Sequence, residues 1–421
     1  MNLPLAGRRA LVTDAHTTGS LAVARSLSAA GMEVTVVREA GRFSLAAASR
    51  HADRVVTLPS VERQASLHLE GLLKEIRARA YDVLIPMTDS TIALLRRERQ
   101  SVEPMVRVAL PPEDVLVGAQ DKRVTVERAR ASGVRVPETR LFASMEEMRA
   151  SADGLQYPCV VKPRFSRQWD GSGPMTRGTV RYAYSGMELR RIFESSNQDP
   201  ASLLVQEFVA GVGIGLFALM ENGSPRALFA HRRLREANPT GGRASLAESM
   251  PLEERVVAPA MRLLGALGWT GVAMVEFKDP GAPQAPVAME VNGRFWGSLP
   301  LAIAAGVDFP LLAVQQLLGL PLSLGQGYRT GVKCRHLQGD LSYLVATFKG
   351  RPRGWSGPFP GRLEALASVT PLPGRWRPFN LRLSDPVPAL GEAADFLRQT
   401  ARSVARRVES RAAGRGAAQE R

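Results

Sequence analysis

The segment Met289–Pro310, which reads MEVNGRFWGSLPLAIAAGVDFP, constrains the fold of this chain more than any other segment. It places Glu290, Asn292 and Arg294 at alternate positions, directly after an apolar run. Side chains at alternate positions of a β-strand share one face, so this strand end presents a carboxylate, an amide and a guanidinium together. The plain alternative is a buried edge strand that carries three solvated polar residues.

A second strand is predicted upstream, at Gly271–Lys278 (GVAMVEFK), and it carries one acid, Glu276. The Pro- and Gly-rich stretch Asp279–Ala285 between the two predicts a hairpin loop. Two carboxylates and an amide oxygen on adjacent strands are the hard ligands that Mg²⁺ prefers, and the neighbouring arginine suits a phosphate or a second carboxylate. The pattern therefore predicts phosphoryl-transfer chemistry, with Mg²⁺ (or Mn²⁺) held by Glu276, Glu290 and Asn292.

Three further blocks precede these strands. Asp121-Lys122 opens a predicted helix that ends before GVRVP (133–137), and YPCVVKP (157–163) and QEFVAG (206–211) follow. In this order and spacing, over roughly residues 112–310, the four blocks resemble the ATP-grasp superfamily, which includes D-alanine–D-alanine ligase, biotin carboxylase and carbamoyl-phosphate synthetase. The segment HRRLRE…PTGG makes the chain similar to a group of predicted carboxylate–amine ligases within it.

The resemblance implies a mixed α/β and α+β fold class, namely an ATP-grasp fold with an N-terminal Rossmann-like pre-ATP-grasp domain. We expect that first domain at residues 1–111, the ATP-grasp domain at 112–320 with its smaller nucleotide lobe at about 137–205, and a C-terminal extension at 321–421. Alternating strands and helices in the first hundred residues agree, because they predict a parallel sheet covered on both faces. The turn after the first strand lacks GxGxxG, so no dinucleotide site is expected there. Thr88-Asp89-Ser90 is favoured as a helix N-cap over a substrate contact.

The resemblance also assigns nucleotide-binding residues. Lys122 and Lys162 would approach the phosphates of ATP, and the loop carrying Gly171 and Gly173 would fold over the triphosphate, although a plain surface hairpin is the alternative. Adenine would be held by the backbone of the hinge strand, at Gln206, Glu207, Phe208 and Val209. The family's ribose-binding acid is missing from Gly211–Gly215, which leaves Glu207 or backbone groups for that task.

The segment His231–Arg243 concentrates arginines beside a Pro-Thr-Gly-Gly turn. Fixed cations and backbone amides free to point at an anion suit an acyl phosphate. We predict that Arg233, with the Gly241-Gly242 amides, contacts the reacting group, and that Arg232 pairs with an acid; Glu248 is placed to orient one of the arginines. A solvated basic strand with a turn is the alternative. Together with Arg294, Arg232 and Arg233 form the predicted catalytic set.

Composition limits the remaining possibilities. The chain has 421 residues, a net charge of +15, two cysteines and five scattered histidines, which indicates neither a disulfide framework nor a zinc site. No apolar run of about 18 residues predicts a membrane span, and the N-terminus lacks the apolar stretch of a signal peptide, so a cytoplasmic location is expected. The basic charge permits nucleic-acid binding, but an arginine-rich composition with an anionic nucleotide ligand is favoured, and no specific nucleic acid is expected.

Downstream of the strands, the sequence predicts a helix at Leu311–Leu318, a loop at Gly350–Gly361, a helix at Ala393–Glu409 with arginines on one side, and a frayed last dozen residues. That basic helix could touch an acidic membrane surface or RNA, but a solvated face is favoured. The predicted activity is an ATP-dependent ligase that activates a carboxylate as an acyl phosphate for attack by an amine, giving an amide, ADP and phosphate. A non-amine acceptor and a non-catalytic nucleotide-binding scaffold remain the alternatives. Small-molecule carboxylate and amine substrates and a possible homodimer are the expected partners.

Overall fold

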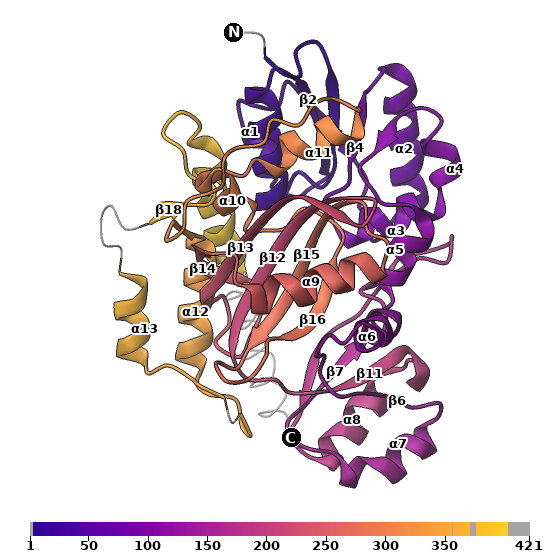
Figure 1. The fold of residues 1–421 in the computed structure, drawn as a ribbon, viewed down its shortest axis with the longest axis vertical. Coiled ribbons are helices and arrows are strands. Elements are labelled where there is room, and N and C mark those ends of the chain that lie inside the picture. Colours follow the sequence, from indigo (N-terminus) through magenta and orange to yellow (C-terminus); the bar gives the residue numbers. More distant parts are fainter. Residues whose placement is uncertain (1–2, 356, 371–375, 403–421) are drawn as a thin grey trace, which may run out of the picture.

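A computed structural model describes residues 3–355, 357–370 and 376–402. The N-terminal region is a five-stranded parallel sheet in the order β3-β2-β1-β4-β5, with helices on its faces (Figure 1). Its central strands are apolar on both sides, as a doubly covered parallel sheet requires. The strands are β1 (Arg9–Val12), β2 (Glu33–Glu39), β3 (Arg54–Leu58), β4 (Val83–Ile85) and β5 (Arg107–Val108), and the helices are α1 (Thr18–Ala29), α2 (Ala65–Ala78), α3 (Asp89–Arg97) and α4 (Arg99–Val102).

A smaller lobe lies at the opposite end of the molecule in Figure 1. Its four-stranded sheet has the order β10-β7-β11-β6, and its core includes side chains from α7 and α8. Helices α5 (Glu113–Gln120) and α6 (Lys122–Ala131) lead into it, and a two-stranded hairpin, β8 (Arg167–Gln168) and β9 (Thr176–Arg177), extends from it. The other elements are β6 (Thr139–Leu141), α7 (Met145–Ser151), β7 (Cys159–Pro163), β10 (Arg181–Ala183), α8 (Gly186–Ser196) and β11 (Leu203–Glu207).

The centre of the molecule is a seven-stranded sheet in the order β16-β15-β12-β13-β14-β17-β18. One face packs on α9, and the other forms the largest core with α1, α10 and α11. This second face therefore meets the N-terminal domain. The elements are β12 (Val212–Glu221), β13 (Ser224–Glu236), β14 (Ala244–Met250), α9 (Glu254–Ala266), β15 (Gly271–Asp279), β16 (Val287–Asn292), α10 (Leu299–Ala305) and α11 (Phe309–Leu317).

The C-terminal segment contacts both the central sheet and the N-terminal domain. β17 (Lys333–Arg335) and β18 (Arg377–Pro378) belong to the seven-stranded sheet, so that sheet crosses the boundary expected at residue 320. Helices α12 (Leu337–Lys349) and α13 (Arg362–Val369) follow β17, and residues 387–402 are helical. Asp385 returns to the N-terminal domain, where its carboxylate accepts hydrogen bonds from Arg25 Nε (2.9 Å) and Ser49 Oγ (2.6 Å).

The expected elements are confirmed, with boundary differences of the usual size. The hairpin that joins the two acid-bearing strands is present as antiparallel β15 and β16. The described residues of 350–361 contain no helix or strand, and the expected helix at 393–409 is helical to residue 402, beyond which it lies outside the described residues. No single helix in the described part of the chain is long and apolar enough to cross a membrane; α10 and α11 meet that criterion only when the two are counted together, across a 95° bend.

Candidate active site

The two acid-bearing strands bring their carboxylates directly opposite each other. In the β15–β16 pair Glu276 faces Glu290, and Met274 faces Asn292. Residues 274 and 276 share one face of β15, so Glu276, Glu290 and Asn292 lie on the same side of the sheet. The strand pattern in the sequence predicted this arrangement. Among the described residues no group of three or more His, Cys, Asp or Glu side chains is placed to hold a metal, so the candidate site consists of two carboxylates and one amide, a donor set that fits Mg²⁺.

Two lysines from different segments act on Glu290. Burial opposes ionisation of Glu290, but the ammonium groups of Lys162, on β7, and Lys122, at the start of α6, lower its pKa below the ordinary value. Burial lowers the pKa of Lys122, whose Nζ donates to Ser166 Oγ at 2.9 Å. Asn292 Nδ2 donates to Glu290 Oε1 at 2.9 Å. The structure thus brings both predicted nucleotide lysines to the predicted metal strand, although the three segments are far apart in the sequence.

Arg233 and Glu276 form a buried ion pair, which the sequence did not predict. Arg233 Nη1 lies 2.8 Å from Glu276 Oε1 and Nη2 lies 2.6 Å from Oε2, and the two side chains are only 8% and 19% exposed. Burial works against the charge of Arg233, but Glu276 raises its pKa. The predicted anion-binding arginine and one predicted metal ligand therefore neutralise each other. A cation that takes Glu276 as a ligand must share this carboxylate with Arg233 or displace it.

The neighbouring arginines have separate partners. Arg232 pairs with Glu248 on β14, with Nη2 2.6 Å from Oε2, which confirms that Arg232 pairs with an acid and that Glu248 orients an arginine. Arg235 is buried against Asp340 of α12. Arg232 thus lies outside the group around Glu276, and its predicted catalytic role gains no support from its contacts.

The glycine turn after β13 differs from the expectation. The N–H of Gly241 donates to the Asn238 carbonyl at 2.9 Å, and Arg233 Nη1 donates to the Gly242 carbonyl, also at 2.9 Å. The Gly241 amide is therefore occupied within the turn and is not free to bind an anion. The turn instead supplies a carbonyl that helps to hold Arg233.

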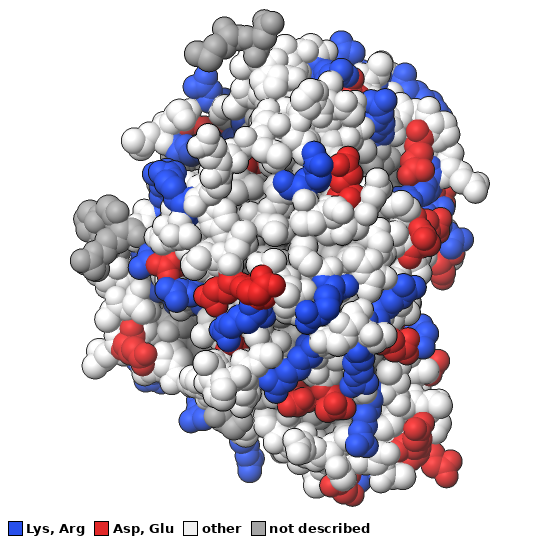
Figure 2. Space-filling view, in the orientation of Figure 1, with Lys and Arg blue, Asp and Glu red and all other residues white. Residues whose placement is uncertain are grey.

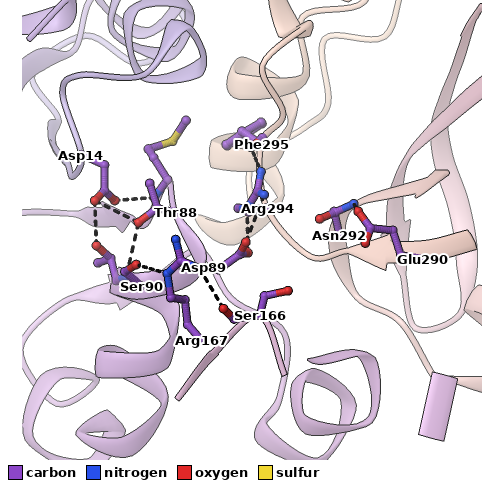
Figure 3. Close-up of polar contacts among 12 residues, drawn as sticks. Asp14, Thr88, Asp89, Ser90, Ser166, Arg167, Glu290, Asn292, Arg294 and Phe295 are labelled. Carbon is purple, nitrogen blue, oxygen red and sulfur yellow. Dashed lines mark hydrogen bonds and ion pairs between the residues drawn. The ribbon is translucent and has the colours of Figure 1, made fainter. Parts of the chain in front are cut away.

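Arg294, the third polar residue of the opening segment, is held by the N-terminal domain. Its Nε and Nη2 donate to the two carboxylate oxygens of Asp89, at 2.8 and 3.2 Å, across 205 positions in the sequence. Burial works against the charge of Asp89, but Arg294 lowers its pKa overall. Figure 3 shows this pair between Asp14 on one side and Asn292 and Glu290 on the other. Thr88 is the expected N-cap of α3. A substrate contact was the less favoured alternative for Thr88-Asp89-Ser90, and a pairing of Asp89 with Arg294 was not predicted. The position of Asp89 at the carboxyl end of a parallel strand, where ligands of α/β sheets bind, was the available signal.

A large cavity joins these groups. It measures about 820 Å³. Strands β15 and β16, the carboxyl ends of β1 and β4, and the helix at residues 387–402 bound it. Glu276, Glu290, Asn292, Arg233, Arg294 and Asp89 all line it, as do His336, Glu392, Asp395 and Gln399 from the C-terminal segment. A smaller cavity of about 50 Å³ adjoins Lys122, Ser166 and the outer part of β16. The larger cavity lies within the size range of pockets that bind small-molecule ligands, about 300–1,000 Å³.

Two aromatic side chains in the cavity lining have unpaired nitrogens. His231, on β13, is fully buried, and burial lowers its pKa to about 3, so the ring is neutral near pH 7. Neither of its ring nitrogens, nor Trp296 Nε1, has a hydrogen-bond partner in the described part of the structure. Both rings pack on Phe217, with centroid distances of 4.7 and 4.2 Å. Neither residue was among the site residues that the sequence predicted.

Two groups of predicted nucleotide residues are not gathered here. The tip that carries Gly171 and Gly173 lies against α3, where a Cβ on Gly171 would come within 2.5 Å of Arg97 Nη2, and it lines neither cavity. This arrangement matches the hairpin alternative.

The hinge strand also departs from the expectation. Gln206 pairs with β6 on one side and β7 on the other, and the N–H of Glu207 donates to the Glu138 carbonyl at 2.8 Å, so these backbone groups are largely used by the sheet. The ring of Phe208 packs on Trp355 (5.1 Å between centroids) and Tyr182 (6.2 Å). The backbone groups of Gln206 and Glu207 are therefore already paired within the sheet. Of the four residues predicted to bind adenine, only Phe208 and Val209 lie beyond the end of β11.

Comparisons with known proteins agree with this architecture. A family model described as "ATP-grasp in the biosynthetic pathway with Ter operon" matches residues 199–339. The N-terminal section of the carbamoyl phosphate synthase large chain of Methanopyrus kandleri is 24% identical over 319 residues, which are 70% of this chain and 54% of that protein. Together these matches support the ATP-grasp superfamily for the matched part of the chain. It spans about half the length of this curated relative.

Solved ATP-grasp structures share the fold at low identity. An L-amino acid ligase from Bacillus licheniformis aligns with a TM-score of 0.58 and 16% identity, over 78% of this chain and 79% of that one. The biotin carboxylase domain of the 2-oxoglutarate carboxylase of Hydrogenobacter thermophilus, crystallised with MgADP, gives 0.61 and 16%, over 77% and 73%. The N5-carboxyaminoimidazole ribonucleotide synthetase of Thermus thermophilus gives 0.56 and 17%, over 75% and 79%. The predicted ATP-grasp fold with an N-terminal Rossmann-like domain is confirmed.

Proposed function

We propose that this protein is an ATP-dependent ligase that activates a carboxylate as an acyl phosphate for attack by an amine. The observation that carries the proposal is the group around β15 and β16, where Glu276 faces Glu290 and two lysines lower the pKa of Glu290. Carboxylates and lysines that lie close together suit the binding of a nucleoside triphosphate with its divalent cation. The fold supports this choice, and the MgADP and amino acid ligase named for two structural neighbours point to the same chemistry.

Each residue then has a task in binding. Glu276, Glu290 and Asn292 would hold Mg²⁺, which when bound neutralises charge on the phosphates. Lys122 and Lys162 would bind the phosphate oxygens of ATP, and Arg294 would bind the carboxylate and then the acyl phosphate. Arg233 lies beside Glu276 and is suited to the same anion once it is drawn away from this carboxylate.

The reaction proceeds in two transfers. A carboxylate oxygen attacks the γ-phosphorus, the bond to the ADP oxygen breaks, and ADP leaves. The amine nitrogen then attacks the carbonyl carbon, the C–N bond forms, and the C–O bond to phosphate breaks with loss of a proton from nitrogen. The residues named above supply positioning and positive charge, which dominate catalysis of phosphoryl transfer, and no covalent protein nucleophile is needed.

The positive charge of the chain does not alter this proposal. On the face shown in Figure 2, basic side chains are accompanied by acidic ones and do not form a separate basic surface. Many arginines are held in ion pairs with acids, as Arg232, Arg233 and Arg294 are. No specific nucleic acid is part of the proposed function.

Trapping of the activated carboxylate tests the proposal. The protein is incubated with MgATP, hydroxylamine and a pool of the twenty proteinogenic L-amino acids or a dialysed cell extract, and products are identified by mass spectrometry. We expect a hydroxamate together with an equal amount of ADP. Formation of a phosphate ester, or of ADP without any hydroxamate or amide, would contradict carboxylate activation. The Glu290→Gln variant is the control for contaminating ligases.

A further inference from the structure

We infer that Asp89, at the start of α3 in the N-terminal domain, is the positioning residue for Arg294 in the reaction. This inference rests on the proposed function, because it assigns to Arg294 the carboxylate or acyl phosphate as its ligand. Asp89 lies in the N-terminal domain, whereas Arg294 directly follows β16 of the central sheet.

The geometry of the pair restricts Arg294 strongly. Asp89 binds the Nε and Nη2 edge of the guanidinium with both carboxylate oxygens, and Nη1 donates to the carbonyl of Phe295 at 3.3 Å. Of the five N–H donors of an arginine, three are used in this way. The remaining hydrogens, on Nη1 and Nη2, belong to a side chain that lines the 820 Å³ cavity beside Glu290. A fork–fork pair of this kind fixes both the position and the plane of the guanidinium.

The helix start that carries Asp89 is held by hydrogen bonds of its neighbours. Asp89 occupies the first turn of α3, where the helix dipole favours a carboxylate. Thr88 precedes it, and Thr88 Oγ1 donates to Asp14 Oδ1 at 3.0 Å. Asp14 is buried, has φ = 53°, and accepts further hydrogen bonds from the hydroxyls of Thr13 and Thr91. The residue before Asp89 therefore belongs to a hydrogen-bonded network centred on Asp14, at the carboxyl ends of β1 and β4.

The next residue links the same helix end to the nucleotide lobe. Ser90 Oγ accepts a hydrogen bond from Arg167 Nε at 3.1 Å and donates to Glu62 Oε1 at 2.9 Å, and Arg167 also pairs with Glu62 at 3.0 Å. Arg167 follows Ser166, the partner of Lys122. Three consecutive residues thus contact three parts of the chain, as Figure 3 shows: Thr88 the N-terminal domain, Asp89 the segment after β16, and Ser90 the lobe.

The pairing with Asp89 fixes the position of the Arg294 charge before the reaction begins. Arginine is a long and flexible side chain, and catalysis by charge depends on placing that charge before the reaction begins. Arg294 follows the end of β16, where the sheet no longer fixes the backbone. Asp89 supplies the missing constraint through both of its carboxylate oxygens. It also borders the smaller cavity that Lys122 lines, but its side-chain hydrogen bonds go to Arg294, so its loss is expected to affect the reacting group more than the affinity for ATP.

A double-mutant cycle tests the inference. Asp89→Asn, Arg294→Lys and the double variant are compared by hydroxamate formation with MgATP, hydroxylamine and the amino acid pool. We expect Asp89→Asn to lower kcat about 10- to 100-fold, as loss of a charged hydrogen bond does, and to change the KM for ATP much less. Because Asp89 acts through Arg294, the double variant should be no slower than Arg294→Lys alone.

The matched control is Asp82→Asn. Asp82 is also an acid of the N-terminal domain that pairs with an arginine, Arg8, but it lies at the amino end of the same sheet and lines neither cavity. Its substitution should leave kcat and KM unchanged. Thermal unfolding of all variants shows whether the fold is retained; a fall in kcat for Asp89→Asn that tracks a loss of fold, and appears equally in Asp82→Asn, overturns the inference.

A binding cycle separates this inference from the proposed function. Calorimetry measures the affinity of acetyl phosphate for the MgADP complex of the same four proteins. Non-additive losses for Asp89→Asn and Arg294→Lys support the positioning role even if no hydroxamate forms. Additive losses, or an unchanged affinity in Asp89→Asn, overturn it even if hydroxamate formation confirms carboxylate activation. Absence of both hydroxamate and acetyl phosphate binding in the unmodified protein overturns both.

Discussion

Replacement of Arg233 by methionine is the most informative single change at this site. Methionine keeps much of the aliphatic volume but removes the charge that now neutralises Glu276. The pair is bidentate, at 2.6 and 2.8 Å, and its side chains are 8% and 19% exposed. Removing one partner of a buried ion pair costs about 3–5 kcal/mol, because the other charge stays buried without compensation. The free energy of unfolding of the unit containing the seven-stranded sheet should fall by that amount.

The adjacent residue provides the control. Arg232 forms a similar pair with Glu248, at 2.6 Å, but its side chain is 54% exposed. Exposed pairs are worth about 0–1 kcal/mol. Arg232→Met should therefore change stability little, although it removes the same charge from the same strand.

Magnesium separates a metal role of Glu276 from a purely structural one. A ligand that binds only the folded state stabilises it by mass action, by about 2.7 kcal/mol at a concentration 100 times its Kd. In Arg233→Met the carboxylate of Glu276 no longer has a competing cation, so MgCl₂ should raise the stability of this variant more than that of the unmodified protein. Urea unfolding with and without MgCl₂, followed by tryptophan fluorescence, measures both effects. Equal Mg²⁺ effects on the two proteins, or equal losses for Arg232→Met and Arg233→Met, would refute this reasoning.

Three further predictions follow from the described contacts. Glu290→Gln should lower substrate-dependent ADP formation by about 10²- to 10³-fold, because charge stabilisation of the transition state is lost; turnover at the original rate would remove Glu290 from the site. Lys162→Ala should weaken ATP binding measured by calorimetry, since a partly buried cation facing phosphates contributes more than a surface charge, and unchanged affinity would return Lys162 to a structural role. Burial disfavours the charge of Asp385, but Ser49, Arg50 and Arg25 lower its pKa overall; the stability it contributes is therefore present above the ordinary Asp pKa of about 3.9 and is lost as the pH falls through the lower folded value. Asp385→Asn should cost about 3–5 kcal/mol at pH 7 and should flatten the loss of stability below about pH 4, and a thermal-unfolding series from pH 2 to 7 that shows the same slope in both proteins would contradict this.

The sequence by itself determined the elements and the faces of the metal strands. Alternation along β16 placed Glu290 and Asn292 on one side, because the period of a strand is two residues; that Glu276 shares this side depends on the register of the β15–β16 pair. The apolar runs and capping residues of the first hundred residues likewise determined a parallel α/β sheet. These are local properties, and short-range physics is sufficient to derive them.

The tertiary structure alone decided which side chains meet. Asp89 and Arg294 are 205 positions apart, and no local pattern reveals a partner at that distance. The sequence showed Arg233 and Glu276 as two site residues, but only the antiparallel order β13-β12-β15, with glycines on β12 between them, lets the long arginine reach across to the carboxylate. The C-terminal segment shows the same limit, since its spacing predicted a solvated basic helix, whereas Glu392, Asp395 and Gln399 line the cavity. Periodicity fixes the face on which a side chain lies, but the partner on that face depends on packing between distant segments.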